Sequence, residues 1–187
     1  HKHPEMKSED QIKEITNKAE KISQLTCSYG LSKGSTRLAY TRVYLPAIQY
    51  PLISSHMSRK TLDGAQAKAT RRFLSSLGFN PNMPRIVAYA PKQMGGIGLQ
   101  RLHTTQGVRN LTLMLKHLRA RTTLGKLFQI AIDWLQRWSG IGVCIMARPK
   151  RRIPPTSAKY LVEIREFLAK CRASVKLKQK PQKMQEK

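Results

Sequence analysis

Acidic residues are scarce in this sequence of 187 residues: 10 Asp and Glu stand against 35 Lys and Arg, giving a formal net charge of +25. A globular chain with this imbalance repels itself unless an anion lies near it. Nucleic acid is the partner that such charge favours, and an anionic membrane surface is the second. A solvated basic surface that binds no partner is the remaining alternative. The only aspartates, Asp10, Asp63 and Asp133, fall on three separate predicted helices, which argues against a carboxylate-bound pair of catalytic metal ions.

Cysteines and long apolar runs are also few. Cys27, Cys144 and Cys171 are far apart and odd in number, so neither a disulfide framework nor a zinc knuckle is indicated, and we expect a reducing, intracellular setting. No apolar run is long enough to span a bilayer, so we expect no membrane partner. His1 and His3 offer only an adventitious metal pair, and no nucleophile arrangement is apparent. We therefore expect no metal site and no catalytic residue in this chain.

Apolar residues recur at helical spacing over most of the chain. The pattern predicts helices over residues 8–29, 33–50, 58–77, 103–119, 123–138 and 157–173. In the second helix, Pro46 should cause a kink or an end. Its predicted buried stripe is Leu38, Thr41, Leu45, Ile48 and Leu52, and that of the third helix is Leu62, Ala65, Ala69, Phe73 and Leu77.

The stretch 77–102 is the only long one that does not follow a helical pattern. Three prolines and four glycines interrupt it. Residues 86–89 are apolar and rich in β-branched side chains, which predicts a strand, and residues 97–99 predict a second one. Gly95, Gly96 and Gly98 are assigned a structural role in the turn, where a Cβ would obstruct the chain. The expected fold is therefore mainly α: about six amphipathic helices around one small β-hairpin at about 85–99.

The composition changes near the C-terminus. Residues 172–187 hold many lysines and almost no apolar side chains, so we expect a disordered basic tail. Residues 1–171 are expected to form one helical region. The chain begins at His1 and its first predicted helix follows almost at once, so we expect a segment of a longer protein.

The irregular stretch and its flanks carry a resemblance. Residues 91–99 (PKQMGGIGL) lie between several short motifs whose order and spacing resemble those of non-LTR (LINE-type) retrotransposon reverse transcriptases, in the thumb and connection region after the catalytic palm. The similarity spans about residues 30–175. Its other motifs are Tyr44–Leu52, Gly78–Asn80 with Met83–Arg85, Lys116–Arg119, Gly125–Leu127 with Asp133–Gln136, and Arg165–Ala169.

The resemblance implies a non-catalytic, thumb-like segment that grips a template–primer of RNA or RNA–DNA hybrid. The palm and fingers, and the Mg²⁺ of a parent polymerase, would belong to an upstream part of the same polyprotein. No Tyr-x-Asp-Asp turn is present in this chain. The alternatives are an inactive mobile-element remnant without a cellular role, and a stand-alone basic helical RNA-binding protein.

The mechanism expected from charge is neutralisation of phosphates without reading of bases. Tyr40, Tyr44 and Tyr50 are candidates for stacking on bases, although tyrosines at helical spacing are more often buried. The candidate nucleic-acid-binding residues cluster around the irregular stretch and in a later loop: Lys68, Arg71, Arg72, Arg85, Lys92, Arg101, Arg109, Lys116, Arg119, Arg148, Lys150, Arg151 and Arg152.

Overall fold

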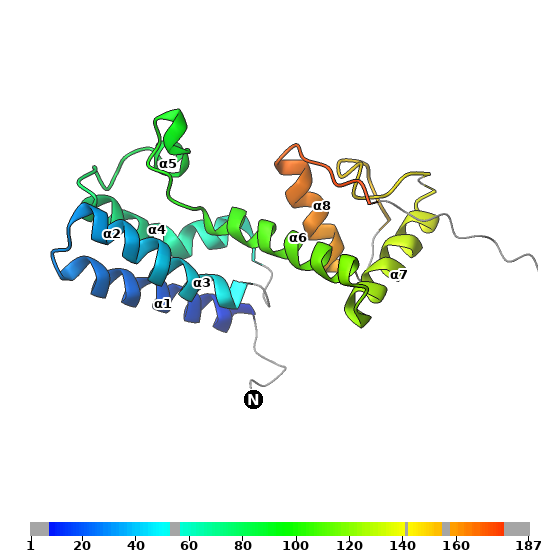
Figure 1. Cartoon of the computed structure of the whole chain (residues 1–187), viewed down its shortest axis with the longest axis horizontal. Helices are drawn as coiled ribbons and strands as arrows, with labels where there is room; N and C mark the ends of the chain where they lie inside the picture. Colours follow the sequence, from blue (N-terminus) through cyan, green and yellow to red (C-terminus); the bar gives the residue numbers. More distant parts are fainter. Residues whose placement is uncertain (1–7, 53–56, 141, 155–157, 178–187) are drawn as a thin grey trace, which may run out of the picture. The chain divides into compact units, whose positions relative to one another are not determined.

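The computed structural model describes residues 8–52, 57–140, 142–154 and 158–177 (Figure 1). These ranges contain helices and connecting turns but no β-strand, which confirms the mainly α fold class. Contacts divide the chain between Arg109 and Asn110 into two compact units, termed unit 1 and unit 2 below. The division expected at 171/172 stays a prediction. No helix within the described ranges is long and apolar enough to cross a membrane.

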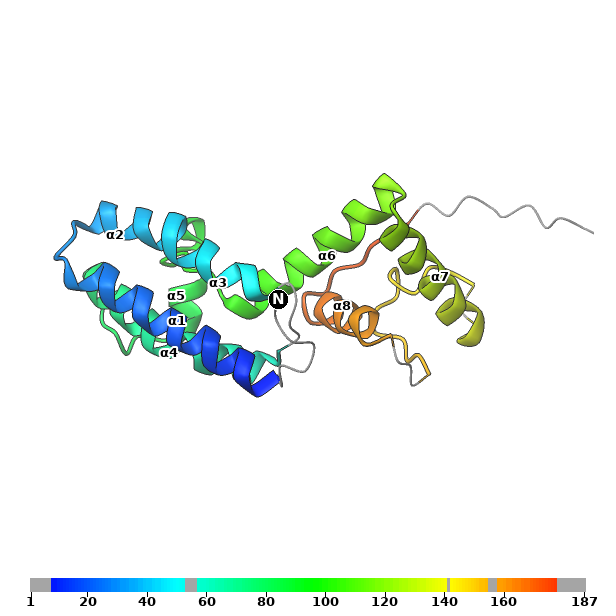
Figure 2. The same cartoon turned by 90° about the horizontal axis from the view of Figure 1, so that it is seen from below.

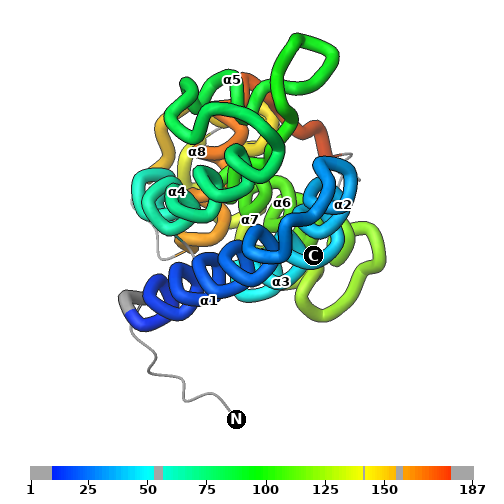
Figure 3. Tube along the Cα trace, turned by 90° about the vertical axis from the view of Figure 1, so that its left-hand side faces the viewer, coloured from blue at the N-terminus to red at the C-terminus, as the bar shows by residue number. Residues whose placement is uncertain are grey.

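Unit 1 is built from long helices that run side by side (Figures 1 and 2). Helix α1 packs against α4 and also contacts the segment from α2 to α3; Figure 3 follows α1 and α4 along the Cα trace. The elements of unit 1 are α1 (Ser8–Ser28), α2 (Lys33–Ala39), the π-helical turn η1 (Tyr40–Tyr44), α3 (Leu45–Leu52), α4 (Arg59–Ser76), α5 (Arg85–Tyr89), the 3₁₀ turn η2 (Lys92–Met94) and the start of α6 (Leu102–Ala120).

Helix α4 follows its sequence pattern closely. Ser58 caps it, because its side chain accepts a hydrogen bond from the amide of Thr61 at 3.2 Å. All five residues of the predicted stripe are buried: Leu62, Ala65, Ala69, Phe73 and Leu77. Phe73 is fully buried and belongs to the unit 1 core.

The segment from α2 to α3 differs from its prediction. The amide of Leu45 bonds to the carbonyl of Tyr40, five residues earlier, so one π turn interrupts an otherwise continuous helix just before Pro46. A proline has no amide hydrogen and its ring crowds the carbonyl four residues earlier, and a widened turn accommodates both effects. Leu38 and Thr41, expected in the stripe, are exposed, while Leu45 is buried as expected.

The π turn changes which side chains face the core. Tyr40 and Tyr44 point inward and meet the ring of Phe73 edge to face, with centroid distances of 4.9 and 5.0 Å. Burial raises the pKa of both phenols far above the usual value. Both rings are buried, which confirms the interpretation favoured for tyrosines at helical spacing, and neither is accessible to a base for stacking. Tyr50 is 80% exposed.

The predicted β-hairpin at about 85–99 is wrong. Residues Arg85–Tyr89 form the short helix α5 after Pro84, and η2 follows. Residues 97–99 do return to this segment, but their amides bond to the last carbonyls of α5 and not to a strand: Ile97 to Val87 at 3.1 Å and Leu99 to Ala88 at 3.0 Å. A helix end leaves such carbonyls without partners, so this pairing replaces a β ladder.

Unit 2 holds the rest of α6, then α7 (Thr123–Trp138) and α8 (Lys159–Lys170). Helices α6 and α7 approach closely at Gly125, where an added Cβ would lie 2.1 Å from the carbonyl oxygen of His117. Thr122 caps α7 by accepting the amide of Gly125 at 3.2 Å. The buried core of unit 2 consists of Met114, Ile132, Leu135, Cys144, Ile145, Met146, Leu161, Ile164 and Leu168.

The first part of the predicted disordered tail is ordered. The amide of Val175 donates to the carbonyl of Met146 at 3.1 Å, and Val175 and Leu177 pack against the unit 2 core. Contacts of Val175 and Leu177 with the unit 2 core therefore order residues 172–177, and the predicted disorder is wrong for these residues. Residues 178–187 lie outside the described ranges.

Candidate nucleic-acid interface

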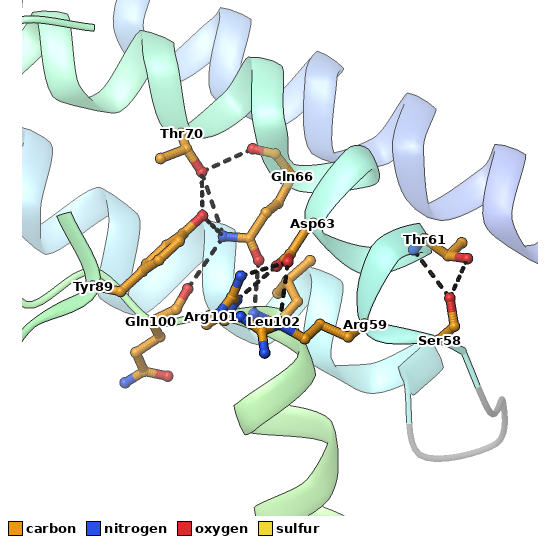
Figure 4. A network of polar contacts seen from close by, with 10 residues as sticks. All are labelled: Ser58, Arg59, Thr61, Asp63, Gln66, Thr70, Tyr89, Gln100, Arg101 and Leu102. Atoms are coloured by element: carbon orange, nitrogen blue, oxygen red, sulfur yellow. Dashed lines mark hydrogen bonds and ion pairs between the residues drawn. The ribbon is translucent and has the colours of Figure 1, made fainter. Parts of the chain in front are cut away.

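Arg101 lies in a network of polar contacts between α4 and the start of α6 (Figure 4). Its Nε donates to Oδ1 of Asp63 at 2.7 Å and its Nη2 to Oδ2 at 2.5 Å. The hydrogen bonds that Arg101 donates to Asp63 raise the pKa of Arg101. Arg59 reaches the same carboxylate at 3.7 Å. This bidentate ion pair neutralises the charge that Arg101 would offer to a phosphate. Arg101 therefore mainly stabilises the packing of α6 on α4.

Gln66 completes this network from α4. Its side chain is 3% exposed, donates to the hydroxyl of Tyr89 at 2.6 Å and accepts the amide of Leu102 at 2.7 Å. The amide of Leu102 belongs to the first turn of α6, which has no partner within its own helix. Gln66 therefore fixes the start of α6 to α4. Sequence reasoning missed it because a glutamine on a helix carries no signal of burial.

Three other candidates in unit 1 are also held by internal contacts. Nη1 of Arg72 donates to the carbonyl of Glu20 at 3.1 Å and to Oγ of Ser23 at 3.2 Å, tying α4 to α1. Nζ of Lys68 lies 2.9 Å from the Glu20 carboxylate, although its side chain is 68% exposed. Nη2 of Arg109 donates to Oε1 of Gln49. These cations stabilise packing within unit 1, which reduces what they contribute to an interface.

The remaining unit 1 candidates differ in accessibility. Arg71 and Lys92 are exposed. Arg85 is half-buried, and its Nη1 is buried without a hydrogen-bond partner among the described residues. The charge in unit 1 is therefore spread among separate positions, and the contacts there do not single out one binding surface.

The turn glycines have distinct geometries. Gly95 and Gly98 adopt φ values of +78° and +75°, in the left-handed region that disfavours side chains. A Cβ on Gly96 would lie 2.1 Å from the carbonyl oxygen of Ala90. Close backbone approach at Gly96 and positive φ at Gly95 and Gly98 bring residues 97–99 back onto α5. The space around Gly95 is open, so the obstruction by a Cβ that was expected there is wrong and only its φ favours glycine.

Unit 2 contains a loop organised by a buried arginine. Arg165 on α8 is 3% exposed, and its guanidinium donates to the carbonyls of Ile145, Arg148 and Arg151. The contact with Arg148 is 3.4 Å long. No carboxylate pairs with Arg165 in the described contacts, and burial lowers its pKa. The loop carbonyls therefore act as its ligands and point toward it.

The basic side chains of that loop lie in solvent. Arg148, Lys150, Arg151 and Arg152 are all exposed, and we call these four residues the basic loop. Because Arg165 engages the loop carbonyls, the backbone path is fixed while four cations remain in water. Fixed, closely spaced cations lose less conformational entropy when they meet an anion than flexible ones do. Lys116 and Arg119, on the part of α6 within unit 2, are exposed as well.

No protein-family model, curated protein or solved structure matches this chain. The described residues contain no group of three or more His, Cys, Asp or Glu side chains that could hold a metal ion. Asp63 is bound to Arg101, and Asp133 accepts a hydrogen bond from Gln129 at 2.8 Å on its own helix. These aspartates have structural partners and lie in different units.

Arg165 was not among the candidates proposed from sequence, although it begins one of the motifs that carry the resemblance. An arginine on an amphipathic helix ordinarily lies in the solvated face. One signal could have marked it: Leu161, Ile164 and Leu168 surround position 165 on the apolar face of α8, and these three residues are buried.

Proposed function

We propose that this chain binds nucleic acid through the phosphate backbone, with the basic loop in unit 2 as the main contact. The role that best fits is a non-catalytic, thumb-like segment of a retroelement reverse transcriptase-like protein, which holds an RNA or RNA–DNA template–primer. The order of short motifs between about residues 30 and 175 supports this role. The chemistry of polymerisation would then belong to a palm elsewhere in the protein.

The observation that carries the proposal is the arrangement around Arg165. A buried guanidinium engages loop carbonyls, and four cations on the same loop face solvent. Arginine forms paired, charge-assisted hydrogen bonds with phosphate oxygens, and lysine adds a point charge. Such contacts position a protein on a duplex without reading its sequence.

The test is a titration of the full chain into a labelled RNA–DNA hybrid at several salt concentrations. Each neutralised phosphate contributes about −0.9 to the slope of log affinity against log salt for a duplex. Replacing the four cations of the basic loop with Gln should reduce the magnitude of that slope by about 3 to 4. Circular dichroism on the same samples checks that the variant remains helical.

The matched control removes the same charge from another place. Lys13, Lys18, Lys21 and Lys60 are exposed in unit 1, and their replacement with Gln also lowers the net charge by four. The control should keep most of the slope. Equal losses in both variants would mean that generic charge binds the nucleic acid, and no binding by the native chain would refute the proposal and favour an inactive remnant.

A further inference from the structure

The apolar side of helix α7 is wider than the part of it that is buried. Ile132 and Leu135 are buried in the unit 2 core, and Gly125 is buried where α7 meets α6. Beside them, exposed apolar side chains spaced three or four residues apart form a stripe, which we call the α7 outer face. Its members are Leu127, Ile130, Trp134 and Trp138, which are 58%, 64%, 52% and 51% exposed. An amphipathic helix of a globular domain normally turns a polar face to water, so this stripe indicates a binding surface.

The two tryptophans dominate the α7 outer face. Their ring centroids lie 4.8 Å apart and the planes are tilted by 41°. Because the rings are not parallel, neither covers the other completely, and about half of each side chain stays in water. Each indole offers a flat, polarisable face, and such a face suits another aromatic ring better than it suits an aliphatic side chain.

Charge decides between the possible occupants. A second copy of this chain would bring another +25 to the surface, and an apolar contact between copies would have to overcome that repulsion. Nucleic acid is anionic and also carries flat aromatic bases. The exposed Lys126 lies next to Leu127 on α7, and the basic loop belongs to the same unit. Cations together with exposed aromatic rings are the combination used by proteins that bind single strands.

We propose that Trp134 and Trp138 form a stacking platform for unpaired bases of RNA or DNA. The proposal rests on the proposed function, because phosphate contacts elsewhere in the unit would bring the strand to this face. A paired duplex buries the faces of its bases, so the platform would bind the single-stranded part of a template or a frayed end. It would add a preference for unpaired bases to an otherwise electrostatic interaction.

The sequence makes the test direct, because Trp134 and Trp138 are its only tryptophans. Intrinsic tryptophan fluorescence therefore reports on the α7 outer face alone. The full chain is titrated with an end-labelled single-stranded RNA and, separately, with the same RNA annealed to its complement as a blunt duplex. Label anisotropy measures binding, and tryptophan emission measures stacking. We expect strong quenching with the single strand and little with the duplex.

The variants separate stacking from simple burial. Trp134→Leu and Trp138→Leu keep an apolar side chain, and each should weaken binding of the single strand about tenfold while duplex binding and its salt dependence stay unchanged. Trp134→Phe retains an aromatic face and should recover most of the affinity. Ile130→Ala removes apolar area from the same face without removing a ring, so it should leave affinity close to native.

The failures of the two proposals are distinguishable. Absence of an anisotropy change with either RNA would refute the proposed function and the platform with it. Binding without tryptophan quenching, or with native affinity in both Leu variants, would overturn the platform and leave phosphate binding intact. Self-association in sedimentation experiments that disappears in Trp134→Leu would show instead that the face joins two copies of the chain.

Discussion

Replacement of Arg165 with Met tests whether one buried guanidinium holds the basic loop in place. Met has a similar length and an apolar side chain, so packing in unit 2 is largely kept while the hydrogen bonds to three loop carbonyls are lost. A hydrogen bond from a charged donor contributes about 1.5–3 kcal/mol. The carbonyls of the exposed residues Arg148 and Arg151 can turn to water, whereas Ile145 is fully buried.

The net effect follows from these opposing terms. One buried acceptor left without a partner costs about 1–3 kcal/mol. Release of a buried charge that has no carboxylate partner among the described residues offsets part of this loss, since burial already lowers the pKa of Arg165. We expect Arg165→Met to destabilise unit 2 by about 2 kcal/mol. Arg165→Lys should be similar, because one ammonium cannot reach all three carbonyls.

Two measurements check this expectation. Urea unfolding followed by circular dichroism gives the loss of stability. Hydrogen exchange gives the local effect at three amides: Ala147, which donates to Cys144 at 2.9 Å, Arg151, which donates to Arg148 at 3.1 Å, and Val175, which donates to Met146 at 3.1 Å. All three should exchange faster in the variant. The control is Lys170→Met, an exposed position on the same helix. Unchanged exchange at all three amides would refute the claim that Arg165 organises the loop.

Three further substitutions test other contacts. Gly96→Ala places a Cβ 2.1 Å from the carbonyl oxygen of Ala90 and should destabilise unit 1 by about 1–3 kcal/mol in urea unfolding; a native midpoint would contradict the close approach. Asp63→Asn leaves the partly buried Arg101 without its carboxylate and should cost about 1–2 kcal/mol by the same assay, whereas a loss below about 0.5 kcal/mol would mean that the pair is only a surface contact. Burial raises the pKa of Glu163 from 4.5 to about 7, so the folded state binds this proton more tightly than the unfolded chain. Stability from this group is greatest below pH 4.5 and is lost as the pH rises to about 7, and Glu163→Gln should remove that fall in a pH series of urea midpoints. If the midpoints of Glu163→Gln fell with pH as those of the native chain do, the raised pKa of Glu163 would be contradicted.

Each of these substitutions has a control in the same unit. Gly64 lies in α4 with open space around the position of a Cβ, so Gly64→Ala should stabilise unit 1 by about 1 kcal/mol. Lys60→Gln removes an exposed charge from α4 near Asp63 and should be neutral. Glu166 is exposed on α8, and Glu166→Gln should lower the pKa of Glu163 slightly, because the neighbouring charge is the second cause of its rise.

The long helices were predictable because their apolar spacing and caps agree. In α4 the stripe ending at Leu77 is buried as expected, and Ser58, the first residue of the predicted range, caps the helix. The short helix α5 was not predictable from local preference, because Ile86 and Val87 favour strands, whereas in the structure they lie in the helix that begins after Pro84. There the contacts with residues 97–99 decide the conformation, and no local pattern contains them.

Candidate cations were found by charge alone, and charge does not distinguish a clamp from an interface. Arg72 and Arg101 have the same side chain as Arg148, yet the first two are bound by partners 49 and 38 residues away in sequence. Those partners, Ser23 and Asp63, can be paired with their arginines only once the fold is known.

The π turn at residues 40–44 holds one residue more than an α-helical turn does, because the amide of Leu45 bonds to residue 40 and not to residue 41. Removing one residue there would restore an ordinary α-helix, and α2 and α3 on either side would keep their relative orientation. Each residue turns an α-helix by about 100°, so a deletion within α2 or α3 instead, where the helix holds no extra residue, would rotate the residues beyond it by that angle relative to the core. The turn is therefore the position in this segment at which a single-codon deletion disturbs the flanking packing least, although the contacts of Tyr40 and Tyr44 with Phe73 would change.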